Sequence, residues 1–410
     1  MQRKLDVYLH ENLAGHLIQD SNGQMLFEYA ESWLENPATI PLSHSLPLAQ
    51  KKFNRNACRG FFAGILPEEN KRKIIAGNLG ISAKNDFAML ELIGGECAGA
   101  VTFVNSGQQL PTHNASYKAI IAEGLAEILQ QLPSRPLMAG EDGMRLSLAG
   151  AQDKIAVHIA NNVISLPLAG TPSTHIIKPA IAHFTGLVFN EYLCMQLAKK
   201  IGINTANVEI GNVCGIDYLQ VERYDRKILN KSDELMRIHQ EDFCQALGII
   251  PENKYQNEGG PSLKQCFALL RSVSSVPVRD LQALLDAVIF NVLIGNNDAH
   301  GKNFSLLYNG ETRLAPLYDL VCTRYYHELS AKLAMKIDRE YLPDKLTAKH
   351  FELLAGDIGF AKQMLKRRTT ELTEITLNKL TEIAIEHEVM NEISAFIKHN
   401  CEQMLIKLSK

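Results

Sequence analysis

The chain has 410 residues, of which 46% are hydrophobic and 21% are charged, and its formal net charge is −3. This length favours two lobes or domains over a single small core, and the weakly acidic balance excludes a globally basic nucleic-acid binder. No apolar run reaches the roughly 18 residues of a membrane span, and the first residues lack the pattern of a signal peptide. We therefore expect a cytoplasmic protein with no membrane partner.

The first part of the chain combines strand and helix patterns. Residues 5–9 alternate apolar and polar side chains, and residues 25–29 form a second strand pattern after Asn22-Gly23, a dipeptide typical of hairpin turns. Helical periodicity follows at residues 68–77 and 116–132. We therefore expect residues 1–110 to form a small α/β module that packs against the rest of the chain.

Strand patterns dominate the next part of the chain. They occur at residues 155–159, 163–166, 175–179, 207–210 and 218–221. Asn161-Asn162 supplies a turn between the first two strands, and Gly202 ends an amphipathic helix predicted at residues 187–201. Residues 111–225 are therefore expected to form a β-rich lobe.

Helical periodicity dominates after Asp225. It occurs at residues 241–247, 262–273, 278–294 and over most of 347–408. A β-rich lobe followed by a helical lobe, here residues 226–410, predicts an α+β fold of the bilobal kinase-like type. The small α/β module would precede these two lobes.

Three polar residues that follow the long apolar helix pattern are typical of phosphoryl transfer from a nucleotide. Asp298 and Asn303 are five residues apart on a loop, and a hairpin pattern then returns Asp319 to the same place. Asp298 could accept the proton of an attacking hydroxyl, and the oxygens of Asn303 and Asp319 suit Mg²⁺ beside phosphates. The alternative is that residues 296–298 only cap the helix and that Asp319 caps another one.

A loop rich in small residues precedes the strand predicted at residues 155–159. It runs from Ser147 to Lys154, and small side chains there would let backbone N–H groups approach phosphates closely. Lys154 and Lys178 lie at strand ends and could contact phosphate oxygens. The alternative is an ordinary loop with two solvated lysines.

Charged residues follow the strand predicted at residues 218–221, at the expected junction of the two lobes. In a bilobal kinase, this segment would receive adenine through backbone groups. The alternative is a surface charge run, which is the interpretation we favour for Arg223 and Arg226.

Other polar patterns have simpler interpretations. His239 has no partner at metal-ligand spacing and is predicted to lie on the surface. The eight cysteines contain no C-x-x-C pair and are expected to be mostly buried thiols in a reducing compartment. The basic cluster at residues 366–368 predicts a solvated helix face, with DNA contact as the alternative.

Several short motifs occur in a fixed order along the chain. They lie at residues 147–154, 174–178, 221–226, 240–245, 254–261, 298–304 and 318–319, and they include Asp298-Ala299-His300-Gly301-Lys302-Asn303 and Tyr318-Asp319. In this order they resemble the HipA family, whose members are serine/threonine kinase toxins of type II toxin–antitoxin modules. The resemblance extends from about residue 61 to about residue 335, and the collinear order is more specific than any one motif.

The resemblance implies a role for each matching residue. Asp298 matches the catalytic aspartate, and Asn303 and Asp319 match the ligands of Mg²⁺. Ser147 matches an autophosphorylated serine whose modification expels the loop and stops the kinase. The nucleotide-binding residues that it implies are Leu148, Ala149, Gly150, Ala151, Gln152, Asp153, Lys154, Lys178, Glu222 and Tyr224. His300 and Lys302 lie within the catalytic loop and could help to neutralise phosphate charge, with a structural role as the alternative for His300. ATP and Mg²⁺ are therefore the expected cofactors.

The resemblance also implies a function and partners. The chain would be a growth-arresting kinase toxin, neutralised by a small HipB-like helix-turn-helix antitoxin, with operator DNA as a partner of that complex. Its protein substrate would be an aminoacyl-tRNA synthetase, with glutamyl-tRNA synthetase as the leading candidate. Two alternatives are a small-molecule kinase of the aminoglycoside phosphotransferase type and a non-catalytic co-repressor that acts with the antitoxin.

Overall fold

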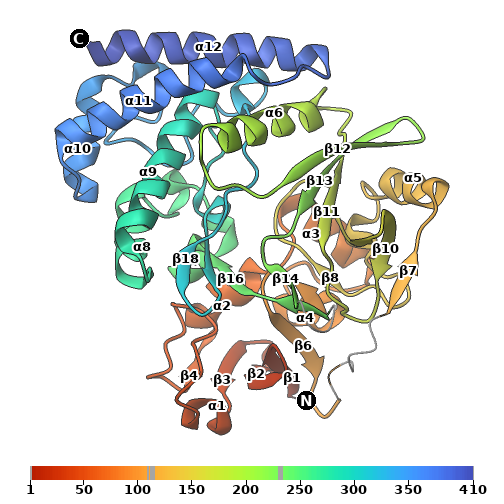
Figure 1. Cartoon of the computed structure of the whole chain (residues 1–410). Coiled ribbons are helices and arrows are strands. Elements are labelled where there is room, and N and C mark those ends of the chain that lie inside the picture. The colour runs from red at the N-terminus through yellow and green to blue at the C-terminus, as the bar shows by residue number, and fades with distance from the viewer. Residues whose placement is uncertain (1, 109, 111–115, 230–233, 410) are drawn as a thin grey trace.

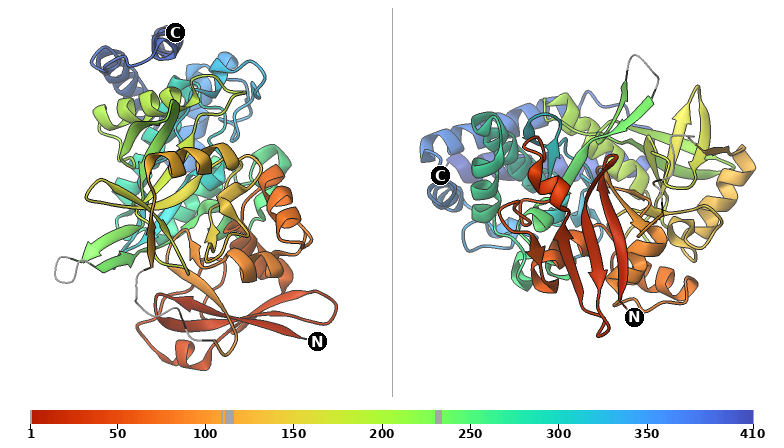
Figure 2. Two further views of the ribbon diagram at one scale, coloured as in Figure 1. Left: turned by 90° about the vertical axis from the view of Figure 1, so that its right-hand side faces the viewer. Right: turned by 90° about the horizontal axis from the view of Figure 1, so that it is seen from below.

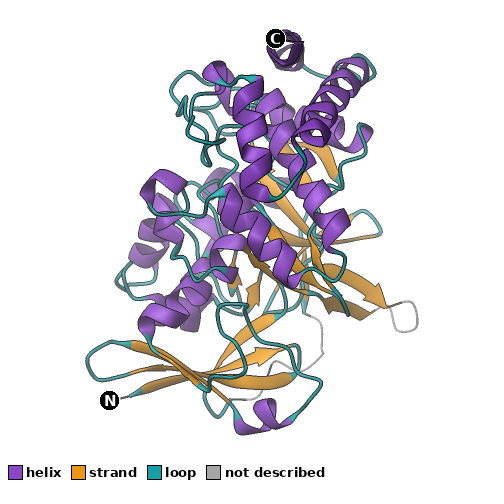
Figure 3. Cartoon of the chain, turned by 90° about the vertical axis from the view of Figure 1, so that its left-hand side faces the viewer, coloured by secondary structure: helices purple, strands orange, loops and turns teal. Residues whose placement is uncertain are grey.

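The computed structural model describes residues 2–108, 110, 116–229 and 234–409. In Figure 1 the N-terminal sheet lies at the bottom, the C-terminal helices lie at the top, and a second sheet lies between them. The left view of Figure 2 places the two termini at opposite ends of the molecule. Figure 3 shows that helices dominate the upper part and strands the lower part.

The N-terminal module is built on a five-stranded antiparallel sheet in the order β4-β3-β2-β1-β6. The strands are β1 (Arg3–Leu9), β2 (Asn12–Gln19), β3 (Met25–Tyr29), β4 (Lys52–Phe53) and β6 (Val101–Asn105). The helices are α1 (Glu31–Glu35), α2 (Arg55–Gly64), α3 (Glu69–Asn78) and α4 (Asp86–Ile93). The two predicted strands, the predicted α3 helix and the hairpin at Asn22-Gly23 are confirmed, and Gly23 supplies the positive φ of 77° at that turn.

A six-stranded antiparallel sheet in the order β12-β13-β11-β9-β10-β7 forms the next layer. Its strands are β7 (Tyr117–Ala119), β9 (Ile155–Ala160), β10 (Val163–Pro167), β11 (His175–Pro179), β12 (Val208–Val213) and β13 (Ile216–Glu222). The helices of this part are α5 (Ala122–Gln131) and α6 (Leu187–Lys200). The helix predicted at residues 116–132 is wrong at its start, because β7 pairs with β10 at the edge of the sheet.

Helices form most of the C-terminal lobe. They are α7 (Phe243–Ala246), α8 (Leu263–Val273), α9 (Pro277–Ile294), α10 (Ala348–Ile358), α11 (Lys362–Leu380) and α12 (Glu388–Ser409). The strands are β14 (Arg226–Leu229), β15 (Glu234–Arg237), β16 (His239–Asp242), β17 (Ser305–Tyr308) and β18 (Thr312–Leu314). The helix predicted at residues 241–247 is wrong at its start, because Glu241 and Asp242 pair with β17. The hairpin predicted after Asn303 is confirmed as β17 and β18.

The six-stranded sheet separates two hydrophobic cores. One face packs against the N-terminal module, and Ile155, Val157 and Ile177 are fully buried in that core. The other face packs against α6 and the C-terminal lobe, where Leu219 is buried with Leu193. The same strands therefore fix the module on one side and the helical lobe on the other. The boundaries at residues 110 and 225, between the module, the β-rich lobe and the helical lobe, stay a prediction.

The segment after β13 is buried, so the surface charge run predicted there is wrong. Arg223 and Arg226 are only 5% and 9% exposed, because their guanidinium groups surround the fully buried carboxylate of Glu96. They lie 3.2 and 2.8 Å from Glu96 Oε1, and Arg237 lies 2.6 Å from Oε2. Burial alone would raise the pKa of Glu96, but the three guanidinium groups lower it to about 2.

This arginine cluster joins distant parts of the chain. Glu96 lies on β5 (Glu96–Cys97), which pairs in parallel with β8 (Leu146–Ser147). Asp225 accepts hydrogen bonds from Arg223 and from the backbone N–H of Gly99, at 2.8 and 2.7 Å. The cluster therefore attaches the segment after β13 to the N-terminal module.

His239 is also buried, contrary to the surface position that we predicted. Its Nε2 lies 2.9 Å from the backbone oxygen of Leu42, and its ring stacks on Tyr308 with the centroids 5.3 Å apart. Burial lowers the pKa of His239 to about 4, so the ring is neutral near pH 7. It forms a contact between the N-terminal module and the β16–β17 pair.

Three smaller predictions can be compared with the structure directly. The basic cluster lies on α11, where Arg367 is exposed and Arg368 donates to Asp286 at 2.7 Å. The cysteines are buried, as expected, except for Cys214. None of the helices in the described part of the chain is long and apolar enough to cross a membrane.

The arginine cluster should control stability. Glu96→Gln removes the carboxylate that pairs with Arg237 and one of the two carboxylates that pair with Arg223 and Arg226. Removal of one partner of a buried ion pair costs about 3–5 kcal/mol. We expect the free energy of unfolding, measured by urea denaturation, to fall by about 3 kcal/mol. Arg367→Gln removes only an exposed pair with Glu371 and should change this free energy by less than about 0.5 kcal/mol. Equal losses in the two variants would contradict the importance of the buried cluster.

Candidate active site

A cavity of about 550 Å³ lies between the six-stranded sheet and the C-terminal lobe. Its walls come from the loop after Ser147, the strand that carries Lys178, the segment after β13 and the loop that carries Asp298. Glu68 of the N-terminal module also lines it. The cavity brings together all the predicted site residues except Ser147 and Asp153.

Lys178 is the centre of a buried charge group in this cavity. Its Nζ donates to Glu191 Oε1 at 2.7 Å and to Asp319 Oδ1 at 2.8 Å. Burial alone would lower the pKa of Lys178, but the two carboxylates raise it above its usual value and keep the ammonium charged. Because Lys178 lies on β11, Glu191 on α6 and Asp319 in the loop after β18, the group ties together the sheet, the helix and the C-terminal lobe.

Asp319 combines an unusual backbone with a strongly perturbed carboxyl group. Its φ is 59°, a conformation that is rare outside glycine and that concentrates at functional sites. Burial alone would raise the pKa of Asp319, but Lys178 and Lys154 lower it to about 2. Burial and the charge of Lys178 lower the pKa of Lys154 to about 8. The site therefore holds an ionised carboxylate beside two lysines, of which one titrates near pH 8.

The loop that carries Asp298 begins where α9 ends. Gly295 ends the helix in the left-handed conformation, with φ 72°, and the side chain of Asn296 accepts a hydrogen bond from the Asp298 N–H at 3.1 Å. Tyr255 OH donates to Asp298 Oδ1 at 2.7 Å. Asn303 Nδ2 donates to the backbone oxygen of Asp298 at 3.3 Å, which closes the loop. The side chain of Asp298 is therefore held in place by a residue outside its own loop.

Asn303 and Asp319 have the chemistry of a magnesium pair. The helix-cap alternative holds in part. Gly295 is the C-cap of α9, and the Asn296 side chain accepts from the Asp298 N–H in an Asx turn at 3.1 Å. Asp319 does not cap the 3₁₀ helix that follows it, η5 (Thr323–Tyr325), because Cys322 is the N-cap of that helix. Within the described part of the chain, no hydrogen bond uses Asn303 Oδ1 or Asp319 Oδ2. These hard oxygens fit Mg²⁺. Since the described residues form no group of three or more His, Cys, Asp or Glu around one point, the ion would take further ligands from phosphate or water.

The loop of small residues after Ser147 is folded inward. Ser147 is fully buried and donates to the backbone oxygen of Ile65 at 3.1 Å. Lys154 Nζ donates to the backbone oxygen of Ala149 at 2.8 Å, which closes the loop on itself. Gly150 has φ 105°, a backbone conformation that residues with a side chain rarely adopt, so this position favours glycine. The alternative of solvated lysines is wrong for Lys178, which is 7% exposed.

The segment after β13 supplies another wall of the cavity. Tyr224 OH donates to Gln240 Oε1 at 2.5 Å, and its ring stacks on that of Tyr318 with the centroids 5.9 Å apart. Glu222 is exposed and accepts a hydrogen bond from Asn207 at 2.7 Å. Aromatic rings at a cavity wall suit the flat face of a base.

His300 and Lys302 line the cavity but also make protein contacts. Lys302 Nζ donates to Asp242 at 2.6 Å and lies 3.6 Å from Glu68 of the N-terminal module. His300 packs edge-on against Tyr255, and burial lowers its pKa. Both residues therefore support the loop between Asp298 and Asn303, and their contact with phosphate stays a prediction.

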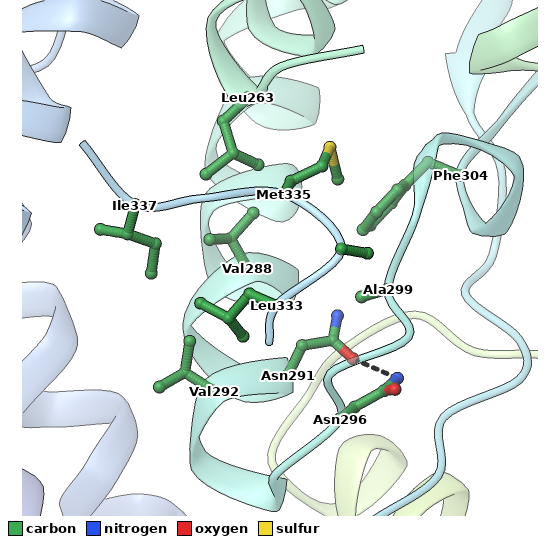
Figure 4. Close-up of a pocket in the computed structure, with 11 residues that line it drawn as sticks. Leu263, Val288, Asn291, Val292, Asn296, Ala299, Phe304, Leu333, Met335 and Ile337 are labelled. Carbon is green, nitrogen blue, oxygen red and sulfur yellow. Dashed lines mark hydrogen bonds between the residues drawn. The ribbon is translucent and has the colours of Figure 1, made fainter. Parts of the chain in front are cut away.

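A second cavity of about 20 Å³ lies behind the Asp298 loop (Figure 4). Apolar side chains such as Val288, Phe304 and Met335 line most of it. Asn296 Nδ2 donates to Asn291 Oδ1 at 2.8 Å on its polar side. This volume suits about one water molecule, so the cavity is too small for a nucleotide.

Sequence analysis missed Glu191 and Tyr255. Glu191 stands on the buried face of α6, and a carboxylate among apolar residues on one helix face was the signal for a buried ion pair. Tyr255 belongs to the motif at residues 254–261, for which the sequence predicted no chemical role.

Known protein families and relatives match this chain over nearly its whole length. Residues 5–104 match the HipA N-terminal domain, and residues 146–380 match the HipA-like C-terminal domain. The chain is 42% identical to a Sinorhizobium fredii protein with a kinase designation, Y4mE, over 99% of each chain. It is 30% identical to the serine/threonine-protein kinase toxin HipA of Shewanella oneidensis, over 99% of this chain and 95% of that protein.

Similarity to solved structures extends over the entire chain. A chain from the complex of HipA, HipB and operator DNA of Shewanella oneidensis MR-1 has a TM-score of 0.85 and 29% identity, and the match covers 99% of this chain and 98% of that chain. This similarity confirms the predicted α+β, bilobal kinase-like fold.

The Lys178 charge group allows a test of its energetics. Lys178→Met leaves Glu191 buried without its partner, and we expect the free energy of unfolding to fall by about 3–5 kcal/mol. In the double variant Lys178→Met/Glu191→Leu the fully buried carboxylate is removed as well. Asp319 then lacks its lysine partner, but its side chain is 38% exposed to water, so most of the loss should be recovered. Chemical denaturation of wild type and both variants measures the difference. A double variant less stable than the single one would show that the unpaired charge of Glu191 is not the main cause of the loss in the free energy of unfolding.

Proposed function

The chain belongs to the HipA family of serine/threonine protein kinases, and on this basis we propose that it is an ATP- and Mg²⁺-dependent kinase toxin of a type II toxin–antitoxin module. The observation that carries the proposal is that Asp298, Asn303 and Asp319 line one cavity together with Lys178. Phosphoryl transfer needs little covalent chemistry from the protein, so placement of the reactants and neutralisation of charge supply most of the catalysis.

The surroundings of each group support a distinct role. Asp298 would accept or orient the proton of the attacking hydroxyl. Asn303 and Asp319 would hold Mg²⁺, which neutralises phosphate charge when it is bound. Lys178 would contact phosphate oxygens, and backbone N–H groups of residues 148–154 would surround them.

The base of the nucleotide would lie against the segment after β13. Tyr224 and Tyr318 offer aromatic faces there, and the backbone near Glu222 would contact adenine. Because Glu222 already accepts a hydrogen bond from Asn207, its carboxylate is less suited to the base than its backbone is.

Ser147 is the proposed autophosphorylation site. Its hydroxyl is buried against Ile65, so it reaches a phosphoryl donor only when the loop moves outward. A phosphate carries a charge of about −1.5 to −2 near pH 7 and does not fit this buried position. Modification would therefore favour the outward loop and oppose ATP binding.

The proposed partners follow from the relatives. The solved neighbour from Shewanella oneidensis contains HipA, HipB and operator DNA. By analogy, this chain would bind a HipB-like helix-turn-helix antitoxin and, within that complex, operator DNA. Its substrate would be an aminoacyl-tRNA synthetase, with glutamyl-tRNA synthetase as the leading candidate, and its compartment would be the cytoplasm.

Asp298→Asn tests the kinase activity directly. The substitution keeps the size of the side chain but removes the proton acceptor, and general-base groups contribute about 100-fold or more to rates. We expect the wild-type chain to gain phosphate during incubation with Mg-ATP, as measured by intact mass. Asp298→Asn should gain none on the same timescale.

Ser147→Ala serves as the matched control. It should prevent the gain of mass but retain phosphorylation of other proteins, which phosphoproteomics of expressing cells would detect. A wild-type chain that gains no phosphate but phosphorylates an aminoglycoside would favour a small-molecule kinase. Growth arrest that persists in Asp298→Asn would contradict the kinase mechanism and favour a non-catalytic co-repressor.

ATP binding should depend on pH through Lys154. Its pKa is about 8 in the free protein, and phosphate oxygens favour its charged form, so its pKa is higher in the complex. Binding is therefore strongest below about pH 8 and weakens as the pH rises through the pKa of the complex. Calorimetric titration with ATP from about pH 7 to about pH 10 should show this loss in the wild type and a weaker, flatter profile in Lys154→Met. Parallel profiles would assign the pH dependence to another group.

A further inference from the structure

The motif at residues 254–261 has no role in the proposed chemistry, yet it contacts the residue on which that chemistry depends. Tyr255 OH donates to Asp298 Oδ1 at 2.7 Å. On this geometry we infer that Tyr255 is a positioning residue for Asp298, an inference that rests on the proposed kinase function. Burial and the charge of Asp298 raise the pKa of Tyr255 above its usual value, so the hydroxyl keeps its proton and donates it.

The hydrogen bond determines which oxygen of Asp298 is available. The carboxylate of a loop residue can rotate about its side-chain bonds. Each rotation changes the position of its two oxygens relative to the substrate hydroxyl that would receive the phosphoryl group. Tyr255 occupies Oδ1, and no hydrogen bond between described residues uses Oδ2. Oδ2 is therefore the oxygen left for a substrate hydroxyl, and fixing it in advance lowers the cost of reaching the reactive geometry.

Tyr255 is itself held in place. Its ring packs edge-on against His300, with the centroids 5.4 Å apart. Its backbone oxygen accepts a hydrogen bond from the N–H of Gly260 at 2.8 Å. A Cβ at Gly260 would lie 2.5 Å from the backbone oxygen of Asn253, so the close turn requires glycine. The spacing of tyrosine and glycine in the motif therefore has a structural reason.

The neighbouring residue anchors this turn to the N-terminal module. Lys254 is 6% exposed, and its Nζ donates to Glu68 Oε2 at 3.0 Å. The other oxygen of Glu68 lies 3.6 Å from Lys302, which belongs to the Asp298 loop. Burial alone would raise the pKa of Glu68, but Lys302 and Lys254 lower it to about 2. One carboxylate therefore fixes the turn of Tyr255 and the loop of Asp298 relative to each other.

Tyr255→Phe tests the inference, because it removes the hydroxyl and keeps the ring. The readout is the rate at which the full chain incorporates phosphate from Mg-ATP at Ser147, measured against ATP concentration. We expect the limiting first-order rate constant of this reaction at saturating ATP to fall about ten-fold, as for loss of one hydrogen bond to a charged group. The ATP concentration that gives half of the limiting rate and the unfolding temperature should not change. A purely structural role would lower the unfolding temperature or raise the half-saturating ATP concentration, and would leave the limiting rate constant unchanged.

Tyr325→Phe is the matched control. It also removes a tyrosine hydroxyl that donates to a carboxylate, that of Glu392, but this pair lies outside the residues that line the large cavity. Its limiting rate constant should equal that of the wild type. A wild-type chain that incorporates no phosphate would overturn the proposed function. Two results with an active wild type would overturn the positioning role alone. In one, Tyr255→Phe is equally fast; in the other, it is slower only because it is less stable.

Discussion

A lysine ammonium group can be buried only where charges and hydrogen bonds replace the water that it loses. Lys178 on β11 meets this condition with Glu191 of α6 and Asp319 of the C-terminal lobe. Because each partner belongs to a different layer, burial of this one side chain fixes the sheet, the helix and the lobe in a single arrangement. The same arrangement leaves Asp319 Oδ2 and Asn303 Oδ1 at one cavity without hydrogen-bond partners among the residues that the structure describes. The interaction that holds the layers together thus also prepares the proposed metal ligands.

The N-terminal module is attached by the same kind of interaction. Glu96 is enclosed by three guanidinium groups from the segments after β13, and Glu68 lies between the ammonium groups of Lys254 and Lys302. In each case a carboxylate of the module compensates cations from segments that line the cavity. Loss of either carboxylate would leave these cations with fewer compensating charges at the edge of the site, because Arg223 would keep only Asp225 and Lys302 only Asp242. The module is therefore part of the structural support of the cavity, although most of the proposed chemical groups come from elsewhere.

Local sequence patterns account for much of the fold but not for its long-range contacts. The hairpin at Asn161-Asn162 and the end of α6 near Gly202 depend on neighbouring residues, and both were predicted correctly. Errors occurred where a distant strand decides the structure, as for β7 and the start of the 241–247 segment. Arg223 was misplaced for the same reason, because its partner Glu96 lies 127 residues away. In the site, Asp298, Asn303 and Asp319 could be found from spacing and family motifs, whereas Glu191 and Tyr255 needed the three-dimensional contacts.

The position of Ser147 couples the N-terminal module to the loop that would surround the phosphates. Its hydroxyl donates to Ile65 at the end of α2, while Lys154 closes the other side of the loop on Ala149. Phosphorylation of Ser147 would remove the first hydrogen bond and would place a strong charge in a buried position, but it would leave the second bond intact. The inward loop is thus held by one contact that the proposed modification breaks and by another that it does not touch. Release of the loop would therefore begin at the contact with the N-terminal module.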